Sequence, residues 1–109
     1  MTQIAVGQPL VTLINVFTVE PDKQQALVDL LIEATESTMR HQPGFVSANI
    51  HRSLDGRHVT NYAQWESEAA FRGMLANQEA RAHMGGALEL ARLEGYLYQV
   101  VSTHQRRNE

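Results

Sequence analysis

The chain has 109 residues, of which 43% are hydrophobic, with no cysteine and a formal net charge of −3. The absence of cysteine excludes disulfides, thiolate zinc sites, iron–sulfur clusters and cysteine nucleophiles, and the scattered Lys and Arg residues make nucleic acid an unexpected partner. The first residues lack the pattern of a signal peptide, and no apolar run is long enough to span a bilayer. We therefore expect one cytoplasmic domain over residues 1–109, with a core over about 10–103 and polar termini.

In the first half of the chain, residues 10–18 are predicted to form a strand, because β-branched and aromatic residues dominate there. Its apolar residues fall on both parities, which is typical of a strand buried on both faces. Pro21 or Asp22 is well placed to open a helix, which Pro43-Gly44 ends. Two further strands are predicted over 45–53 and 58–65, and Asp55-Gly56 predicts a hairpin turn between them.

In the second half, Ser67 is predicted to cap another helix. The stretch 79–93 is helical in character, but Gly85-Gly86 predicts a kink that divides it. Gly95 precedes a last strand, predicted over 96–103. The order β-α-β-β-α-β is that of an α+β, ferredoxin-like split β-α-β fold, an antiparallel sheet with helices on one face. Since both faces of strand 10–18 are apolar, we expect the open face to pack on a second copy, giving a homodimer.

Side-chain parity gathers polar residues on the strand faces. Asn61 and Trp65 share one side of strand 58–65, and Asn15 has the parity of apolar positions in strand 10–18. Asn is a poor strand former, and a buried amide is costly unless it is hydrogen-bonded, so these positions are candidates for a functional site. The ordinary alternative is an amide that bonds a neighbouring backbone group or water, and a Trp that belongs to the core. His51 and Asn49 are expected to face the same pocket, or in the case of His51 to face solvent.

Other kinds of site find little support. None of the five His residues has metal-binding spacing relative to another, so we expect no metal. No nucleophile elbow, phosphate loop or dinucleotide fingerprint is present, so we expect no flavin or nicotinamide cofactor.

The sequence resembles the antibiotic biosynthesis monooxygenase (ABM) family over about residues 10–103. The resemblance rests on the stretch Pro43 to Gly56 and on Asn61-Tyr62-Ala63-Gln64-Trp65, which is similar to the family's Asn-x-x-x-Trp segment. It implies a dimeric α+β barrel with one pocket in each subunit, between helices and sheet. In the quinone-forming members of this family, O₂ oxidises an anthrone-type phenol of an aromatic polyketide pathway to a quinone without flavin, haem or metal.

By this resemblance, the catalytic residues are expected to be Asn15, Asn61 and Trp65, with His51 as a base used in some members. Asn amides can stabilise an oxyanion, and Trp65 can supply an apolar wall and an N–H donor. Further residues are expected to contact the aromatic substrate: Phe17, Tyr62, Phe71, Arg81 and Tyr98.

Three alternatives remain open. One is haem degradation, for which the related members supply a helix His, and His83 is the nearest candidate here. Another is the isomerisation or detoxification of a small quinol or signalling compound. The third is a dimer that binds an aromatic ligand without turning it over.

Overall fold

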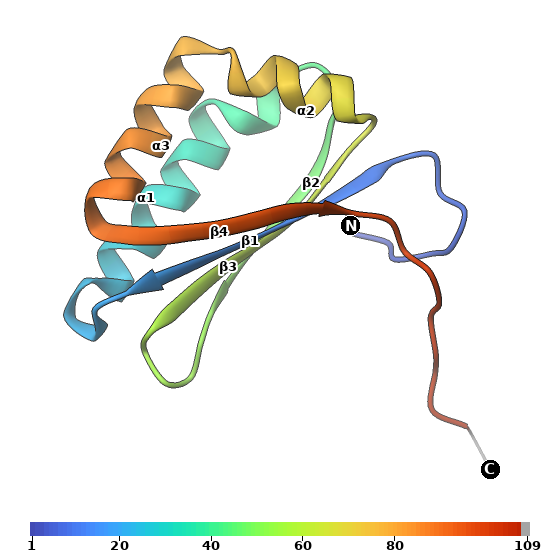
Figure 1. The fold of residues 1–109 in the computed structure, drawn as a ribbon, viewed down its shortest axis with the longest axis horizontal. Coiled ribbons are helices and arrows are strands. Elements are labelled where there is room, and N and C mark those ends of the chain that lie inside the picture. The colour runs from blue at the N-terminus through green and yellow to red at the C-terminus, as the bar shows by residue number, and fades with distance from the viewer. Residues whose placement is uncertain (108–109) are drawn as a thin grey trace.

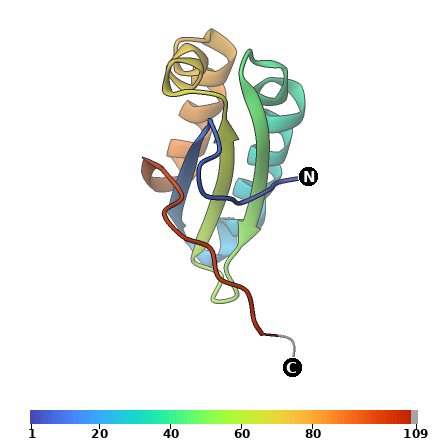
Figure 2. The same ribbon diagram turned by 90° about the vertical axis from the view of Figure 1, so that its right-hand side faces the viewer.

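The computed structural model describes residues 1–107 and contains a four-stranded antiparallel sheet with helices on one face (Figures 1 and 2). The strands lie in the order β2-β3-β1-β4, so β1 and β3 form the centre of the sheet. The strand bounds are Val11–Val19 for β1, Phe45–Arg52 for β2, His58–Trp65 for β3 and Ala91–Tyr98 for β4. The helix bounds are Gln24–Ser37 for α1, Glu68–Leu75 for α2 and Gln78–Leu90 for α3, with short 3₁₀ turns at Pro21–Lys23 and Met39–His41. The predicted α+β ferredoxin-like fold is confirmed.

Side-chain caps determine where the second and third helices begin. The Ser67 hydroxyl accepts a hydrogen bond from the Ala70 N–H at 3.0 Å, which confirms the predicted cap of α2. The Asn77 amide oxygen accepts from the Ala80 N–H at the same distance and caps α3. The helical region 68–90 is therefore divided at Asn77, between α2 and α3, and not at the glycine pair.

The prediction of a kink at Gly85-Gly86 was wrong, because α3 continues through both glycines. Gly86 allows close packing at this point, since a Cβ there would lie 3.2 Å from a terminal methyl group of Leu30 on α1. The last strand was also misplaced, as β4 occupies 91–98 and not 96–103. Its partner β1 begins at Val11, and Thr12 already pairs with Tyr98, so only Val11 of β1 lies beyond that pair and the ladder cannot extend to 103.

Gly44 fixes the approach of β2 to α2. Its φ of +82° is a left-handed conformation that favours glycine. A Cβ at this position would lie only 2.3 Å from the Cβ of Ala70. The predicted helix terminator is therefore also a close-packing position that brings the start of β2 beneath α2.

The hairpin between β2 and β3 is held by Asp55. Its carboxylate accepts hydrogen bonds from the Ser53 hydroxyl at 2.6 Å and from the Arg57 N–H at 2.9 Å. These bonds favour the ionised form and lower the pKa of Asp55. The turn predicted from Asp55-Gly56 is confirmed.

The helix-facing side of the sheet has two parts. One, which we call the packed half, consists of the buried residues Phe17, Val19, Leu27, Leu31, Val59 and Ala87. The other, the hollow half, is built around Leu13, Ala63, Trp65, Met74 and Ala80 and encloses the cavity described below. Both halves are built on the same two central strands.

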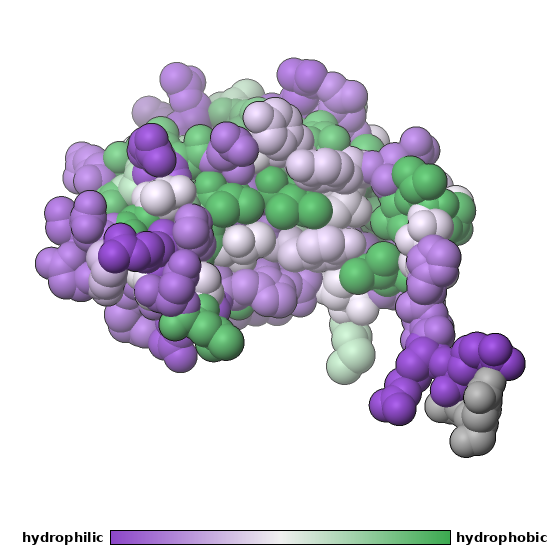
Figure 3. Space-filling model, turned by 60° about the horizontal axis from the view of Figure 1, so that its bottom comes forward, coloured by the Kyte–Doolittle hydropathy of each residue, from purple (hydrophilic) through white to green (hydrophobic). Residues whose placement is uncertain are grey.

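The opposite side of the sheet, which we call the outer face, carries no helix (Figure 2). Part of it is covered by the N-terminal residues: Gln64 donates a hydrogen bond to the Gln3 carbonyl at 2.7 Å, and Asn49 donates to the Thr2 hydroxyl. Apolar side chains gather across the middle of this face (Figure 3), and Tyr96 and Tyr98 are 58% and 46% exposed on β4. None of the helices in residues 1–107 is both long and apolar enough to cross a membrane.

Candidate active site

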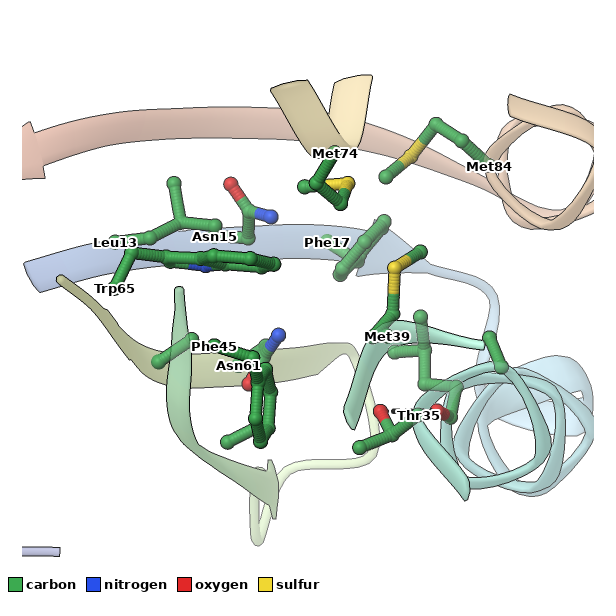
Figure 4. Close-up of a pocket in the computed structure, with 14 residues that line it drawn as sticks. Leu13, Asn15, Phe17, Thr35, Met39, Phe45, Asn61, Trp65, Met74 and Met84 are labelled. Carbon is green, nitrogen blue, oxygen red and sulfur yellow. Dashed lines mark hydrogen bonds between the residues drawn. The ribbon is translucent and has the colours of Figure 1, made fainter. Parts of the chain in front are cut away.

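The register of β1 and β3 brings the two predicted asparagines together. Asn15 lies directly opposite Asn61, and Val11 lies opposite Trp65, in the antiparallel ladder between these strands. Asn15, Asn61 and Trp65 all line one cavity of about 50 Å³ between the sheet and the helices (Figure 4). The structure therefore brings together the three residues that parity had placed on one face.

The rest of the cavity is almost entirely apolar. Phe17, predicted as a substrate contact, lies in its wall. Among residues 1–107, the lining contains no Asp, Glu, His, Lys, Arg, Cys or Tyr, so the cavity wall offers no acid or base. The other lining residues are Leu13, Leu31, Ala34, Thr35, Met39, Phe45, Ala48, Ala63, Met74 and Met84.

Two polar atoms are buried in this wall without a hydrogen-bond partner in the described chain: the amide oxygen of Asn61 and the indole Nε1 of Trp65. A buried group without a partner costs about 1–3 kcal/mol. One of these groups is an acceptor and the other is a donor. Together they match a ligand that presents both a hydroxyl group and an oxygen acceptor, such as a phenol that also carries a carbonyl group.

Aromatic neighbours fix the orientation of Trp65, which is only 2% exposed. Phe45 at the start of β2 contacts it edge-on, with ring centroids 5.5 Å apart and an interplanar angle of 88°. Phe71 on α2 contacts it at 6.3 Å and 67°. Such edge-to-face pairs are worth about 0.5–1.5 kcal/mol beyond burial. The indole plane is therefore held as a rigid wall of the cavity (Figure 4).

Gly95 on β4 leaves room for the side chain of Asn15. The two residues are paired across β1 and β4, and a Cβ at position 95 would lie 1.9 Å from the Asn15 amide oxygen. Any other residue would force the amide to move. Gly95 was expected to precede the last strand, and it is instead an interior position of β4 that allows the placement of Asn15.

His51 does not reach the cavity, which corrects the prediction that it shares a pocket with Asn15 and Asn61. A register shift between Phe45 and Ser47 reverses the parity of β2 after its first residues. Ala48 therefore lines the cavity, whereas His51 is exposed. Asn49 likewise lies outside the lining and donates a hydrogen bond to the Tyr62 carbonyl at 3.0 Å.

Four predicted substrate contacts also lie outside the lining of the cavity. Tyr62 alternates with the lining residues Asn61 and Ala63 along β3, so it points to the outer face. Tyr98 pairs with Thr12, which precedes the lining residue Leu13 on β1, and so it points to the outer face as well. Phe71 supports Trp65 from behind and lines a neighbouring space of about 280 Å³. Arg81 lines another space, of about 240 Å³, next to α3.

His83, the candidate haem ligand, also lies outside the lining. Its Nε2 is 3.1 Å from the hydroxyl of buried Thr38, and that hydroxyl donates to Glu79 at 3.2 Å. Within the described residues, no three His, Asp or Glu side chains lie close enough together to hold a metal ion.

Sequence reasoning missed the methionines. The chain has four, and the three beyond Met1 all line the cavity, from separate helical segments: Met39, Met74 and Met84. Each lies in a helical stretch, where an apolar residue is ordinarily read as core. Their shared position became visible only when the helices were placed over the sheet.

Fold and cavity thus define a small α+β protein with an apolar, aromatic-walled cavity between the sheet and the helices. The antibiotic biosynthesis monooxygenase profile matches residues 10–85. The chain is 52% identical over 83 residues to tetracenomycin-F1 monooxygenase of Streptomyces glaucescens, which covers 76% of this chain and 74% of that protein. This chain belongs to the antibiotic biosynthesis monooxygenase family.

Solved structures agree with this assignment. SnoaB, a cofactor-independent oxygenase from Streptomyces nogalater, superposes with a TM-score of 0.74 at 28% identity, covering 87% of this chain and 96% of that one. The monooxygenase ActVA-Orf6 of Streptomyces coelicolor, solved with the ligand nanaomycin D, gives a TM-score of 0.77 at 28% identity. That match covers 92% of this chain and 95% of the other.

Proposed function

We propose that this protein is a cofactor-independent monooxygenase that uses O₂ to oxidise an anthrone-type phenol, an aromatic polyketide intermediate, to a quinone. The observation that carries the proposal is the pair of unpartnered buried polar atoms, Asn61 Oδ1 and Trp65 Nε1, in an otherwise apolar cavity. The similarity to tetracenomycin-F1 monooxygenase and to SnoaB supports the reaction class.

The first step is loss of a proton from the methylene carbon opposite the anthrone carbonyl, which gives an aromatic enolate. Asn15 and Asn61 line the site from facing positions on β1 and β3, and their amide N–H groups can donate hydrogen bonds to the developing enolate oxygen. Preorganised donors of this kind are worth about 2.7–4 kcal/mol each in other enzymes. Lowering the energy of the enolate is therefore the main contribution we assign to the asparagines.

The second step is the reaction with O₂. The enolate transfers one electron to O₂, and the two radicals combine to form a carbon–oxygen bond at the former methylene carbon. The resulting hydroperoxide loses water as that carbon becomes a carbonyl, so one oxygen atom enters the quinone and the other leaves as water. Trp65 Nε1–H can donate to the peroxide or carbonyl oxygen, and the aromatic wall excludes bulk water.

The absence of an acid or base among the described lining residues has a consequence for the pH profile. The proton must leave through the ionisation of the substrate itself and not through a protein base. We expect the pH midpoint of kcat/KM to move with the pKa of the substrate across a series of substituted anthrones. A midpoint that stayed fixed across the series would indicate a titrating protein group.

An oxygen-electrode assay with anthrone, run with a chelator, tests the proposal directly. We expect consumption of one O₂ per anthrone, faster than air oxidation in buffer, and one ¹⁸O atom from ¹⁸O₂ in the quinone by mass spectrometry. Trp65→Phe keeps an aromatic wall but removes the N–H donor, so it should lower turnover about ten-fold while the protein stays folded. A rate equal to that in buffer, with anthrone bound, would contradict the proposal and favour a binding protein.

We also propose that two copies of the chain pair through the outer face. Ile14 and Val16 on β1 are only partly buried by the chain itself, and Tyr96 is largely exposed beside them. Burying this face would add to the modest core of a short chain. Light scattering should give twice the mass of the chain, and Val16→Arg should reduce it to a single copy. A single-copy mass for the unmodified protein would contradict this arrangement.

A further inference from the structure

The cavity at Asn61 and Trp65 is too small for the ligand class proposed for it. Its volume is about 50 Å³, whereas pockets for drug-sized ligands usually measure ~300–1,000 Å³. An engineered protein cavity that binds a single benzene molecule measures about 150 Å³. A ligand of several fused rings therefore requires more space than this compartment contains.

That space lies next to the cavity, behind two methionines. The first neighbouring compartment measures about 280 Å³ and extends from Asn15 towards Phe71. The second measures about 240 Å³ and lies along α3 beside Arg81. Met74 and Met84 line both of these compartments as well as the cavity at Trp65. They are the only two residues shared by all three spaces in the described chain.

The close-up view shows how the two side chains are placed. Met74 descends from α2 and Met84 reaches in from α3, and both lie above Asn15 and Phe17 (Figure 4). Met74 is 6% exposed, and Met84 is half-buried. Methionine is unbranched, has three rotatable side-chain bonds and packs well against aromatic rings through its sulfur. It is a residue that can move aside at little cost and then contact the ring that displaced it.

We propose that Met74 and Met84 form a movable partition that determines how large a ligand the site can bind. When their side chains change rotamer, the three compartments join into one site whose volume reaches the range of a polycyclic ligand. The reacting ring then lies against Trp65 and Asn61, and the distal rings lie between α2 and α3. This inference rests on the proposed function, because it names the size class of that same substrate.

The helix α3 supports this arrangement at Gly85. This residue lines the compartment beside Arg81, and a Cβ there would meet no atom within 4 Å. Glycine in a helix interior costs roughly 0.5–1 kcal/mol relative to alanine. The missing side chain leaves the outer compartment open beside Met84.

The test compares two isomeric substitutions. Isoleucine and leucine have the same atoms, but isoleucine is branched at Cβ and holds about 90% of one χ1 rotamer in a helix. The double variant Met74→Ile/Met84→Ile therefore stiffens the partition, and Met74→Leu/Met84→Leu is the matched control. Binding is measured by calorimetry with 2-naphthol, which has two rings, and with 1,8-dihydroxyanthraquinone, which has three. Trp65 is the one tryptophan of the chain, so its fluorescence gives a second readout at the site.

For the three-ring compound, we expect the Ile pair to raise Kd about ten-fold above the Leu pair. The two-ring compound also exceeds the cavity of about 50 Å³ but reaches less far into the neighbouring compartments, so its difference should be smaller, about three-fold. Equal Kd values for the Ile and Leu pairs, at unchanged melting temperature, would overturn the partition. Failure of the wild-type protein to bind either compound would overturn the proposed aromatic site itself, and the partition with it.

Discussion

The packed half and the hollow half occupy the same side of the same sheet, yet one is filled by apolar side chains and the other encloses a cavity with polar atoms in its wall. In the packed half, Leu27 and Val59 are fully buried and lie outside the lining of the cavity. In the hollow half, the corresponding strand positions hold Asn15, Asn61 and Trp65, and a cavity remains between them and the helices. One set of strands therefore supplies both the core and the candidate site.

The comparison shows that the features which lower stability are concentrated in the hollow half. Filling the hollow half with aliphatic side chains would remove two unpartnered polar atoms and a void, each of which disfavours folding. Local choices that oppose stability are typical of functional positions. We expect substitutions in the packed half to affect stability, and substitutions in the hollow half to affect turnover.

The largest expected effect is on stability, from Leu27→Ala in the packed half. Leu27 is 0% exposed, and its truncation should lower the free energy of unfolding by about 2–5 kcal/mol. Ile32→Ala on the same helix is the control, because Ile32 is 47% exposed and should cost far less. Urea denaturation measures both, and equal losses would contradict the division into two halves.

The next effect is on turnover, from Asn61→Leu in the hollow half. Turnover should fall about 10²–10³-fold, because an oxyanion donor is lost. Stability should stay equal or rise, because an unpartnered buried amide becomes apolar.

Asn49→Leu is the matched control for that change. The Asn49 amide is satisfied by Thr2 and the Tyr62 carbonyl, so its loss should cost about 1 kcal/mol of stability and leave turnover unchanged. Equal changes in turnover and stability for Asn61→Leu and Asn49→Leu would contradict the assignment of Asn61, and not Asn49, to the site.

A smaller effect is expected from Gly95→Ala. The added Cβ displaces the Asn15 amide, so turnover should fall about ten-fold. Gly73→Ala on α2 is the control, because a Cβ there meets nothing within 4 Å. In an Asn15→Ala background, Gly95→Ala should have little further effect on turnover, which a double-mutant cycle measures. Additive losses would show that Gly95 acts on something other than Asn15.

The smallest effect is expected from His51→Ala. Because the β2 bulge places this side chain outside the cavity, the rate of anthrone oxidation should change less than about two-fold. A large loss of rate would show that His51 reaches the substrate from the outer face or from a second copy of the chain.

Much of this arrangement is encoded locally and could be predicted. The alternation of β1 and β3 was sufficient to place Asn15, Asn61 and Trp65 on one face, and the capping residue Ser67 marked the start of α2. These features depend on side-chain period and short-range hydrogen bonds.

The features that escaped prediction depend on partners distant in the chain. A single bulge reversed the parity of β2 and removed His51 from the site. The role of Gly95 depends on the strand opposite it, and the methionines meet only after α2 and α3 have packed over the sheet. Arg81 and Phe71 were expected as contacts, and they line the outer compartments behind the methionines.

The N-terminal residues held on the outer face affect how the protein should be handled. Thr2 and Gln3 hydrogen-bond to Asn49 and Gln64 on that face. A purification tag fused before Met1 would therefore emerge on the surface where we propose that two copies meet. Residues 99–107 also extend to the helix-free side of the sheet (Figure 1). A tag at either end should therefore be removed before pairing is measured.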